Sequence, residues 1–314
     1  MTHPIVDKID KLVEVHEKPA LFLSGGLDST IAIIGNGYWS KCIQKYTSVY
    51  FNVKYIADSK FDLNKIWKDD EISGVIIATP IDTHFKLAME AIGAGKHVLL
   101  EKPIAMTTLD ANLIRKAAKD NNVKIGIEYT QTFSKTMEYI RTNLPLIGEV
   151  RFFEMSSKHL GRFTGFNVYW LLASHHLSIL DMFFKLDQFK IGLTDHTTYD
   201  NICTTGSINL LGEQVSGRID VSLDFPSKEM YATFYGDKGT LQYTPLAEHS
   251  VVVTLFDRVR SDKLNGTVTG TYTYSADERN NLQHSMRYFC DLMNNTAESN
   301  IDSAIRITNA LENS

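Results

Sequence analysis

Short apolar runs alternate with amphipathic stretches through the first half of the chain. The runs that predict strands cover residues 31–34, 53–57, 75–78, 98–100 and 123–127. The stretches that predict helices cover residues 39–46, 62–68, 82–94 and 107–121. We expect Asp82 or Thr83 to cap the third of these helices and Thr108 to cap the fourth. Uniformly apolar strands that alternate with helices indicate βαβ units and a parallel sheet.

The pattern changes near Leu144 and Pro145, where strand-like segments begin to follow one another. These segments cover residues 149–157, 202–211, 215–225, 229–236 and 250–256, with hairpin turns at 212–213 and 236–239. Helices are predicted at 168–184 and over 278–312. Consecutive strands favour an antiparallel sheet, so the sequence predicts an α/β domain followed by an α+β domain. We place an extension at 1–29 and the two domains at 30–148 and 149–314, with the C-terminal helix packing back on the first.

Composition excludes several classes of protein. The chain has 314 residues with 43% hydrophobic residues and a net charge of −5, so neither nucleic acid nor an anionic membrane is an expected partner. Its three cysteines are far apart, which favours a reducing compartment and argues against disulfides or a zinc site. No apolar run reaches membrane-spanning length and no signal peptide is visible, so we expect a cytoplasmic protein without a metal.

A glycine-rich turn follows the first predicted strand. Gly35 and Gly37 form a Gly-x-Gly element, but Ser40 stands where a third glycine would fall. Such a turn lets the backbone approach a diphosphate, which the next helix N-terminus can bind. Asp58, at the end of the second strand, can accept hydrogen bonds from ribose hydroxyls and favours NAD, whereas Lys60 leaves NADP open.

A second loop competes with this interpretation. Residues 24–29 read Ser-Gly-Gly-Leu-Asp-Ser and resemble the loop of the N-type ATP pyrophosphatases, whose backbone amides could cradle a pyrophosphate. That alternative requires a helix after Ser29, which the glycines at 35 and 37 would end after about one turn. The other possibility is a turn that joins an N-terminal extension to the first strand.

Two further elements lie after predicted strands. Residues 78–84 read Ala-Thr-Pro-Ile-Asp-Thr-His, and residues 95–105 contain Glu101-Lys102-Pro103 directly after an apolar strand. Ligands of open parallel sheets bind beyond the carboxyl ends of the strands. A lysine at that edge can anchor a cofactor or transfer a proton, although a surface charge pair would have the same sequence.

Together the three elements closely resemble the glucose–fructose oxidoreductase/inositol dehydrogenase (Gfo/Idh/MocA) family over about residues 31–150, and more weakly beyond. The resemblance implies a Rossmann domain that binds NAD or NADP, and an open, mostly antiparallel sheet that shapes the substrate site and packs in homodimers or homotetramers. It implies an NAD(P)-dependent oxidoreductase that acts on a secondary alcohol or ketone of a sugar-like small molecule. The implied cofactor-binding residues are Gly35, Asn36, Gly37, Tyr38, Trp39, Asp58, Ser59, Ala78, Thr79, Pro80, His84, Glu101 and Lys102.

The catalytic half of the resemblance is incomplete. Lys102 matches the lysine that contacts the reacting hydroxyl, but the family's Asp-x-Gly-x-His-x-x-Asp signature is altered. With His175 aligned on its histidine, Leu171 and Ser178 replace the aspartates. Helical geometry places His175 with Ser174 and Ser178, and His176 on an apolar side, so His175 is the candidate for chemistry and His176 the alternative.

The departures leave several hypotheses open. Proton transfer could use Lys102 with His175, or Lys102 with Tyr129, and we name all three as substrate-site residues. The family's arginine before a phenylalanine is replaced in the segment 129–133, which weakens the case for a strongly anionic substrate. The alternatives are a non-catalytic sensory or structural protein that binds the cofactor, and an ATP site at 24–29.

Overall fold

The first sheet is parallel throughout, as the apolar runs predict. The computed structural model describes residues 29–161, 165–245, 247–260, 264–276 and 281–312. The sheet has the order β2-β1-β3-β4-β5. Its strands are β1 (Thr30–Ile34), β2 (Asn52–Ala57), β3 (Ile72–Ile77), β4 (His97–Glu101) and β5 (Ile125–Glu128). All of their carboxyl ends therefore meet at one edge.

Helices cover both faces of this sheet, which explains why its strands are apolar on both sides. They include α2 (Tyr38–Thr47), α4 (His84–Gly93), α5 (Thr108–Asp120), α8 (Asn281–Met293) and the short α3 (Asn64–Trp67). Ile31 and Ile33 of β1 belong to the apolar cluster that includes residues of α2 and α8. Ala32 and Ile34 point the other way, into the cluster with α4 and α5.

Three local expectations for the first half are wrong. The N-cap of α5 is Thr107, whose hydroxyl accepts from the Asp110 N–H at 3.1 Å, so the cap lies one residue before Thr108. Neither Asp82 nor Thr83 caps α4 through its side chain; the Thr83 hydroxyl donates to the Pro80 carbonyl instead. The helix expected over 62–68 covers only Asn64–Trp67.

The second sheet has eight strands in the order β13-β12-β11-β10-β6-β9-β8-β7. Only β6 and β9 pair in parallel; the other neighbours are antiparallel. The predicted fold class is therefore confirmed. The strands are β6 (Val150–Leu160), β7 (Lys190–Tyr199), β8 (Ile202–Leu211), β9 (Ser216–Ser222), β10 (Asp224–Gly236), β11 (Gly239–Tyr243), β12 (Val251–Arg260) and β13 (Leu264–Tyr274).

The sequence did not predict the two edge strands. Every described position of β7 is exposed or half-buried, and β13 is rich in threonine. A strand with little buried surface lacks the apolar alternation by which strands are recognised. The internal strand β11 (Gly239–Tyr243) was missed as well, although its positions alternate between buried and more exposed ones.

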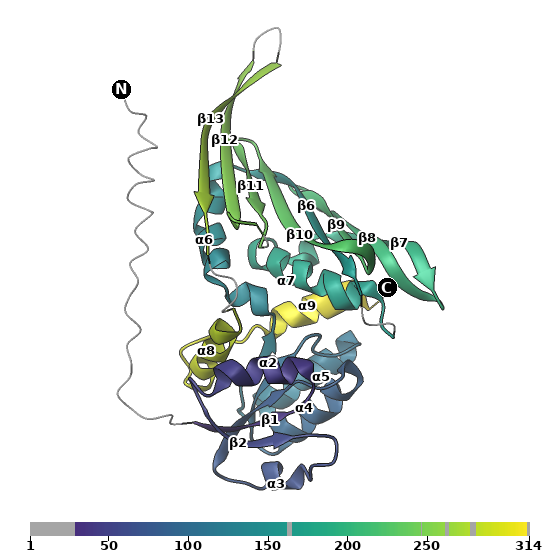
Figure 1. The fold of residues 1–314 in the computed structure, drawn as a ribbon, viewed down its shortest axis with the longest axis vertical. Coiled ribbons are helices and arrows are strands. Elements are labelled where there is room, and N and C mark those ends of the chain that lie inside the picture. The colour runs from purple at the N-terminus through teal and green to yellow at the C-terminus, as the bar shows by residue number, and fades with distance from the viewer. Residues whose placement is uncertain (1–28, 162–164, 246, 261–263, 277–280, 313–314) are drawn as a thin grey trace.

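Helices α7 (Ser174–Phe183) and α9 (Ile301–Leu311) lie between the two sheets, whereas α6 (Lys135–Asn143) runs beside β13 (Figure 1). A π-helical turn, Tyr169–Ala173, precedes α7 where one continuous helix was expected. The single helical region expected over 278–312 is two helices, since α8 ends at Met293 and α9 begins at Ile301.

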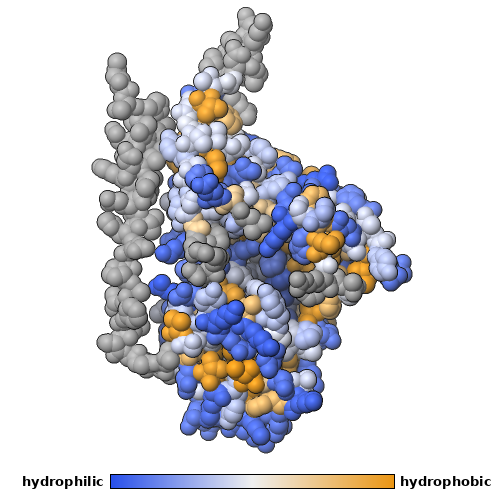
Figure 2. All heavy atoms as spheres, in the orientation of Figure 1, coloured by the Kyte–Doolittle hydropathy of each residue, from blue (hydrophilic) through white to orange (hydrophobic). Residues whose placement is uncertain are grey.

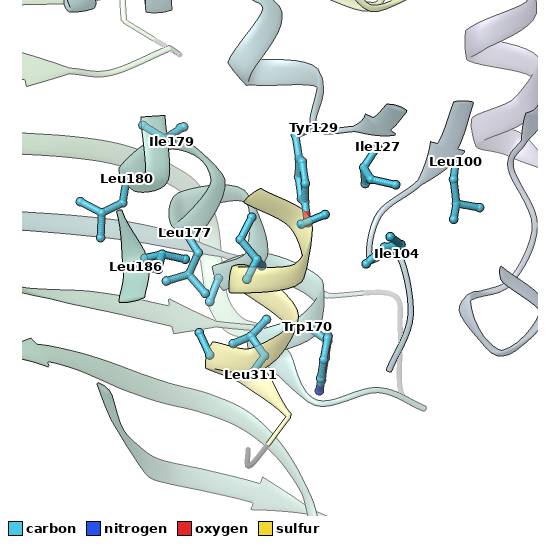
Figure 3. Packing of buried hydrophobic residues seen from close by; sticks show 14 of the residues in the cluster. Leu100, Ile104, Ile127, Tyr129, Trp170, Leu177, Ile179, Leu180, Leu186 and Leu311 are labelled. Atoms are coloured by element: carbon cyan, nitrogen blue, oxygen red, sulfur yellow. The ribbon is translucent and has the colours of Figure 1, made fainter. Parts of the chain in front are cut away.

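Helix α9 joins the two bodies. It contacts α5 and β5 of the first sheet as well as α7. Figure 3 shows α9, which carries Leu311, between Leu177 of α7 on one side and Tyr129 and Ile127 on the other, and all four residues belong to one apolar core. Helices α8 and α9 come after the predicted boundary at 148/149 but pack on the first sheet. The division of the chain at that point therefore stays a prediction.

Residues 1–28 lie outside the described part of the chain, so most of the extension and of the 24–29 loop is not tested. One requirement of the ATP hypothesis is contradicted. The residues after Ser29 form strand β1 (Thr30–Ile34), whereas a pyrophosphatase loop needs a helix there. Within the described helices, none is long and apolar enough to cross a membrane.

Candidate active site

Two hydrogen bonds and the close approach of a carbonyl group hold the turn after β1. The Gly35 N–H donates to the Ala57 carbonyl at 2.8 Å, and the Ser40 hydroxyl donates to the Gly35 carbonyl at 2.7 Å. Gly35 has a φ of +113°, and a Cβ there would lie 2.2 Å from the Ala78 carbonyl oxygen. Only glycine fits this position. Ser40, which replaces the third glycine, therefore stabilises the turn through its hydrogen bond to Gly35.

Gly37 has a different environment. It is the N-cap of α2, and a Cβ built on it meets no atom within 4 Å. Nothing in the described residues therefore demands a glycine here, whereas a ligand approaching the backbone would. The first-turn N–H groups of a helix lack intrahelical partners and attract anions. The open space beside Asn36, Tyr38 and Trp39, all of which are exposed, fits the diphosphate of a dinucleotide.

The end of β2 carries the acid that the sequence singled out. Asp58 and Ser59 are exposed, and Asp58 Oδ1 accepts from the Lys60 N–H at 2.9 Å. The carboxylate faces solvent and keeps acceptor capacity for ribose hydroxyls. Lys60 is exposed beside it, so both cofactor alternatives stay compatible with the structure.

His84 fastens two loops together. Its Nδ1 lies 2.8 Å from the Pro103 carbonyl oxygen, and its Nε2 lies 3.0 Å from that of Thr79. The ring is buried, and burial lowers the pKa of its imidazole despite these two contacts. Thr79 and Pro80 are partly or fully exposed in front of it, after Ala78 at the end of β3. This placement favours a positioning role for His84 over contact with a cofactor.

Lys102 connects the two bodies. Its Nζ donates to the Leu171 carbonyl at 2.9 Å, within the π-helical turn before α7. Burial lowers the pKa of the Lys102 ammonium, which the neighbouring Glu101 partly counteracts. The lysine therefore follows β4 at the place where the second body meets the carboxyl edge of the first sheet. Its partner is the backbone at the position where the family carries an aspartate.

The two histidines of α7 have different surroundings. His175 lies one helical turn after Leu171, is half-buried, and has no described partner for its Nδ1. Burial, followed by the charge of Lys102, holds the pKa of His175 well below its usual range, with His176 and Lys228 adding to the effect. His176 is fully buried, which lowers its pKa to about 4. His175 is thus the histidine on the side of Lys102.

Tyr129 is not placed to meet a substrate. It is 1% exposed, and Figure 3 shows it in the apolar core between Ile127 and α9. Its hydroxyl has no described partner, and burial raises its pKa. The expected substrate contact through Tyr129 is therefore wrong in this structure, because the residue after β5 turns into the core.

Sequence reasoning missed Glu128, the last residue of β5. It pairs in register with Glu101 of β4 and is 1% exposed. The Ser285 hydroxyl of α8 donates to its Oε1 at 2.8 Å, and burial raises the pKa of this carboxyl. Burial, together with the charge of Glu128, also raises the pKa of Glu101, to which the Trp39 indole N–H donates. The available signal was an acid directly after an apolar run, as at Asp58 and Glu101.

Figure 2 shows the surface hollowed between the lower body, built on the first sheet, and the upper body, built on the second. The described residues contain no group of three or more His, Cys, Asp or Glu side chains that could hold a metal ion. A parallel sheet with a glycine turn after β1, an acid after β2 and a lysine facing a second body is the arrangement of a dinucleotide-binding fold.

Comparison with known proteins gives the family. The sequence model of the oxidoreductase family with NAD-binding Rossmann fold, Gfo/Idh/MocA, matches residues 30–129. Residues 30–129 therefore match this family in sequence, as the motifs in them predict.

Two curated relatives agree. An oxidoreductase from Formosa agariphila is 29% identical over 143 residues, which are 44% of this chain and 42% of that protein. The scyllo-inositol 2-dehydrogenase (NADP(+)) IolU of Bacillus subtilis is 35% identical over 107 residues, 34% of this chain and 33% of the relative. The matched segments thus span less than half of either relative.

The fold likeness extends further than the sequence likeness. A solved structure from Magnetospirillum magnetotacticum superposes with a TM-score of 0.76 at 22% identity. The superposition covers 90% of this chain and 98% of the other. Both sheets therefore share the fold of known proteins, including the second half that the family model does not reach.

Proposed function

We propose that the protein transfers a hydride between NAD or NADP and a secondary alcohol or ketone of a sugar-like small molecule. The observation that carries the proposal is Lys102, which directly follows β4 and donates to the Leu171 carbonyl, one helical turn before His175. A cation fixed at this point stabilises a developing alkoxide, and a lysine of lowered pKa can accept or return the hydroxyl proton.

The residues at the carboxyl edge fit the cofactor. Gly35 permits the tight turn, and the open space over Gly37 leaves room for the diphosphate. The exposed Asp58 carboxylate supports NAD over NADP, because it would repel a 2′-phosphate. A bound nicotinamide would supply the hydride chemistry. The protein side chains then have to orient the alcohol, exclude water and move one proton.

The substrate class rests on relatives and on the site. One relative is named as a scyllo-inositol dehydrogenase, a name that concerns a ring of hydroxyl groups. In this chain Lys102 and His175 are the polar side chains available to such hydroxyls, and Lys228 acts on His175 from β10. We propose a polyhydroxylated ring as the substrate.

The experiment compares Lys102→Met with Lys119→Met, the same substitution at an exposed position of α5. Hydride transfer would be followed by nicotinamide absorbance with a panel of inositols, sugars and nucleotide sugars. Lys102→Met should lower kcat by about 10²–10⁴-fold, the usual contribution of a positioned acid or base. Full kcat in Lys102→Met would contradict the role of the lysine.

A second function is a protein that binds the cofactor without turnover. It is favoured by one observation: within the described residues, no carboxylate is paired with His175. This alternative predicts that NAD(H) raises the melting temperature while the whole substrate panel stays inert. Turnover of any member of the panel would exclude it.

We also propose that the chain forms a homodimer or homotetramer through the outer face of the second sheet. Phe152 and Tyr235 lie on that face, 43% and 37% exposed, with ring centroids 5.8 Å apart. An uncovered sheet face with exposed aromatic residues supports association. Size-exclusion chromatography with light scattering tests it, and Tyr235→Glu should shift the protein towards monomer.

A further inference from the structure

The two acids that end β4 and β5 are neighbours. Glu101 and Glu128 pair in register in parallel strands, so their side chains leave the sheet on the same side. Glu128 is 1% exposed, and the Glu101 carboxyl is close enough to feel its charge. Two neighbouring carboxylates, one buried and the other half-buried, cannot both ionise without a cost, because like charges repel more strongly where little water reaches them.

The donors around the pair are too few for two anions. Glu101 accepts from the Trp39 indole and, at 3.3 Å, from the Lys102 N–H. The Glu128 carboxyl interacts with the hydroxyls of Ser285, at 2.8 Å, and of Thr130, while its Oε2 is buried and makes no hydrogen bond to a described residue. Buried carboxylates normally fill their acceptor sites with donors. The shortage favours a neutral, protonated carboxyl in the pair.

The charged groups that face the pair do not remove this conflict. Lys102 of β4 supplies one positive charge next to Glu101, while Tyr288 of α8 faces Glu128 with a phenol. From α2 the nearest donor is the uncharged indole of Trp39. Among the described groups that act on the two acids, one cation thus faces two carboxyls.

We propose that Glu101 and Glu128 form a coupled carboxyl pair that carries one proton in common and serves as the proton reservoir of Lys102. Glu128 is a positioning residue, since it acts through Glu101 and touches no substrate. The role towards Lys102 rests on the proposed function; the shared proton does not. Glu128 lies outside the Glu101-Lys102-Pro103 element, and the pairing of β5 with β4 brings it beside Glu101.

The proton path balances in both directions. In alcohol oxidation a bound oxidised nicotinamide would take up the hydride, and the neutral amine of Lys102 would accept the O–H proton, so that ketone and ammonium result. The ammonium then gives its proton to the carboxylate of the pair, which returns it to water. In ketone reduction the pair returns a proton to the amine, and the ammonium protonates the developing alkoxide.

The first test needs no substrate and uses the cofactor-free protein. When the pKa of a carboxyl is higher in the folded than in the unfolded state, the free energy of unfolding falls as pH rises. The reason is that the unfolded chain releases the proton at a lower pH than the folded one. Glu128→Gln removes this loss. Its melting temperature minus that of the wild type should therefore increase steadily from pH 5 to pH 8.

The control for this test is Glu138→Gln, the same change at an exposed glutamate of α6. Its melting curve should run parallel to that of the wild type at every pH. Parallel curves for Glu128→Gln would overturn the proposal. Infrared spectroscopy of the wild type gives a second measurement should the variant fail to fold. A protonated carboxyl band at pH 7 is expected, and its absence would overturn the proposal as well.

The third test uses activity and separates the two proposals. The pH profile of kcat should contain an inflection from the carboxyl pair. In Glu128→Gln the profile should keep its shape, but this inflection, which then reports Glu101 alone, should move down by about one pH unit or more because the neighbouring anion is gone. An unmoved inflection with active enzyme would overturn the pair and leave the oxidoreductase intact. If no substrate is turned over but the melting and infrared results hold, the proposed function fails and the pair stands.

Discussion

Glycines at positions 35 and 37 belong to one sequence element, yet the structure separates their roles. Gly35 is required by the fold, since its φ is +113° and the Ala78 carbonyl lies against it. Gly37 faces open space, so its small size matters only when something binds there. One motif thus holds a residue for folding and a residue for binding.

Substituting each glycine by alanine should separate these roles. Gly35→Ala should lower the free energy of unfolding by about 1–3 kcal/mol or more, because it adds backbone strain and a clash with a carbonyl. Gly37→Ala should leave the melting temperature unchanged and weaken NAD(H) binding at least tenfold. Thermal melting and fluorescence titration check both, and unchanged NAD(H) affinity in Gly37→Ala would argue against a diphosphate at the α2 N-terminus.

The adjacent histidines of α7 give a second residue-scale prediction. His175→Asn should lower kcat by about 10²–10⁴-fold with little change in stability, because the ring is half-buried on the side of Lys102. His176→Asn should do the reverse and cost about 1–3 kcal/mol, since the ring is fully buried. Steady-state kinetics and urea unfolding measure the two effects, and an exchange of outcomes would make His176 the catalytic candidate.

At the scale of elements, the contact between α7 and α9 depends on one buried ion pair. Both oxygens of Asp181 accept from Arg306, at 2.8 and 2.7 Å, and the Leu186 N–H adds a bond of 3.0 Å. Burial would raise the pKa of Asp181, but these donors, Arg306 foremost, lower it overall. The ion pair thus joins α7, which carries His175 and His176, to α9, which packs against the first sheet.

Removing the cation should destabilise the protein strongly. Arg306→Met leaves the Asp181 charge buried and unpaired, which costs about 3–5 kcal/mol. The matched control is Arg115→Met, which breaks the exposed Arg115–Asp302 pair between α5 and α9 and should cost about 0–1 kcal/mol. Urea unfolding at pH 7 measures both. Equal losses would mean that burial of the pair does not matter.

For the whole molecule, the buried histidines set the response to acid. His84 and His176 have lowered pKa values because they are buried, and the pKa of His176 is about 4. As pH falls below about 6.5, the unfolded chain binds protons that the folded chain cannot, so stability falls with pH until the folded values are reached.

This loss should be measurable as a slope. Between pH 6.5 and pH 4, His176 alone should remove roughly 3 kcal/mol from the free energy of unfolding, by about 1.36 kcal/mol per pH unit. Urea unfolding at several pH values gives the slope, and His176→Asn should flatten it. Equal slopes in the variant and the wild type would show that His176 is not held neutral.

Features of the fold and of the site could be predicted where they depend on residues close together in the sequence, and not where they depend on contacts between distant residues. The strands of the first sheet are apolar on both faces, so they stand out from the sequence; β7 and β13 bury little and do not. Lys102 could be identified because a local element contains it. Glu128 could not, because its meaning depends on Glu101 in the neighbouring strand and on Ser285, which lies 157 residues away.

The sequence by itself determined the order of strands and helices in the first half, the glycine turn, the acid after β2 and the lysine after β4, since each is written in consecutive residues. Only the tertiary structure decided what surrounds them. It set His84 behind two loops, turned Tyr129 into the core, gave Lys102 the Leu171 carbonyl, and brought Glu101 and Glu128 together. The physical reason is that burial and partner choice arise from contacts between segments far apart in the chain, which local patterns do not record.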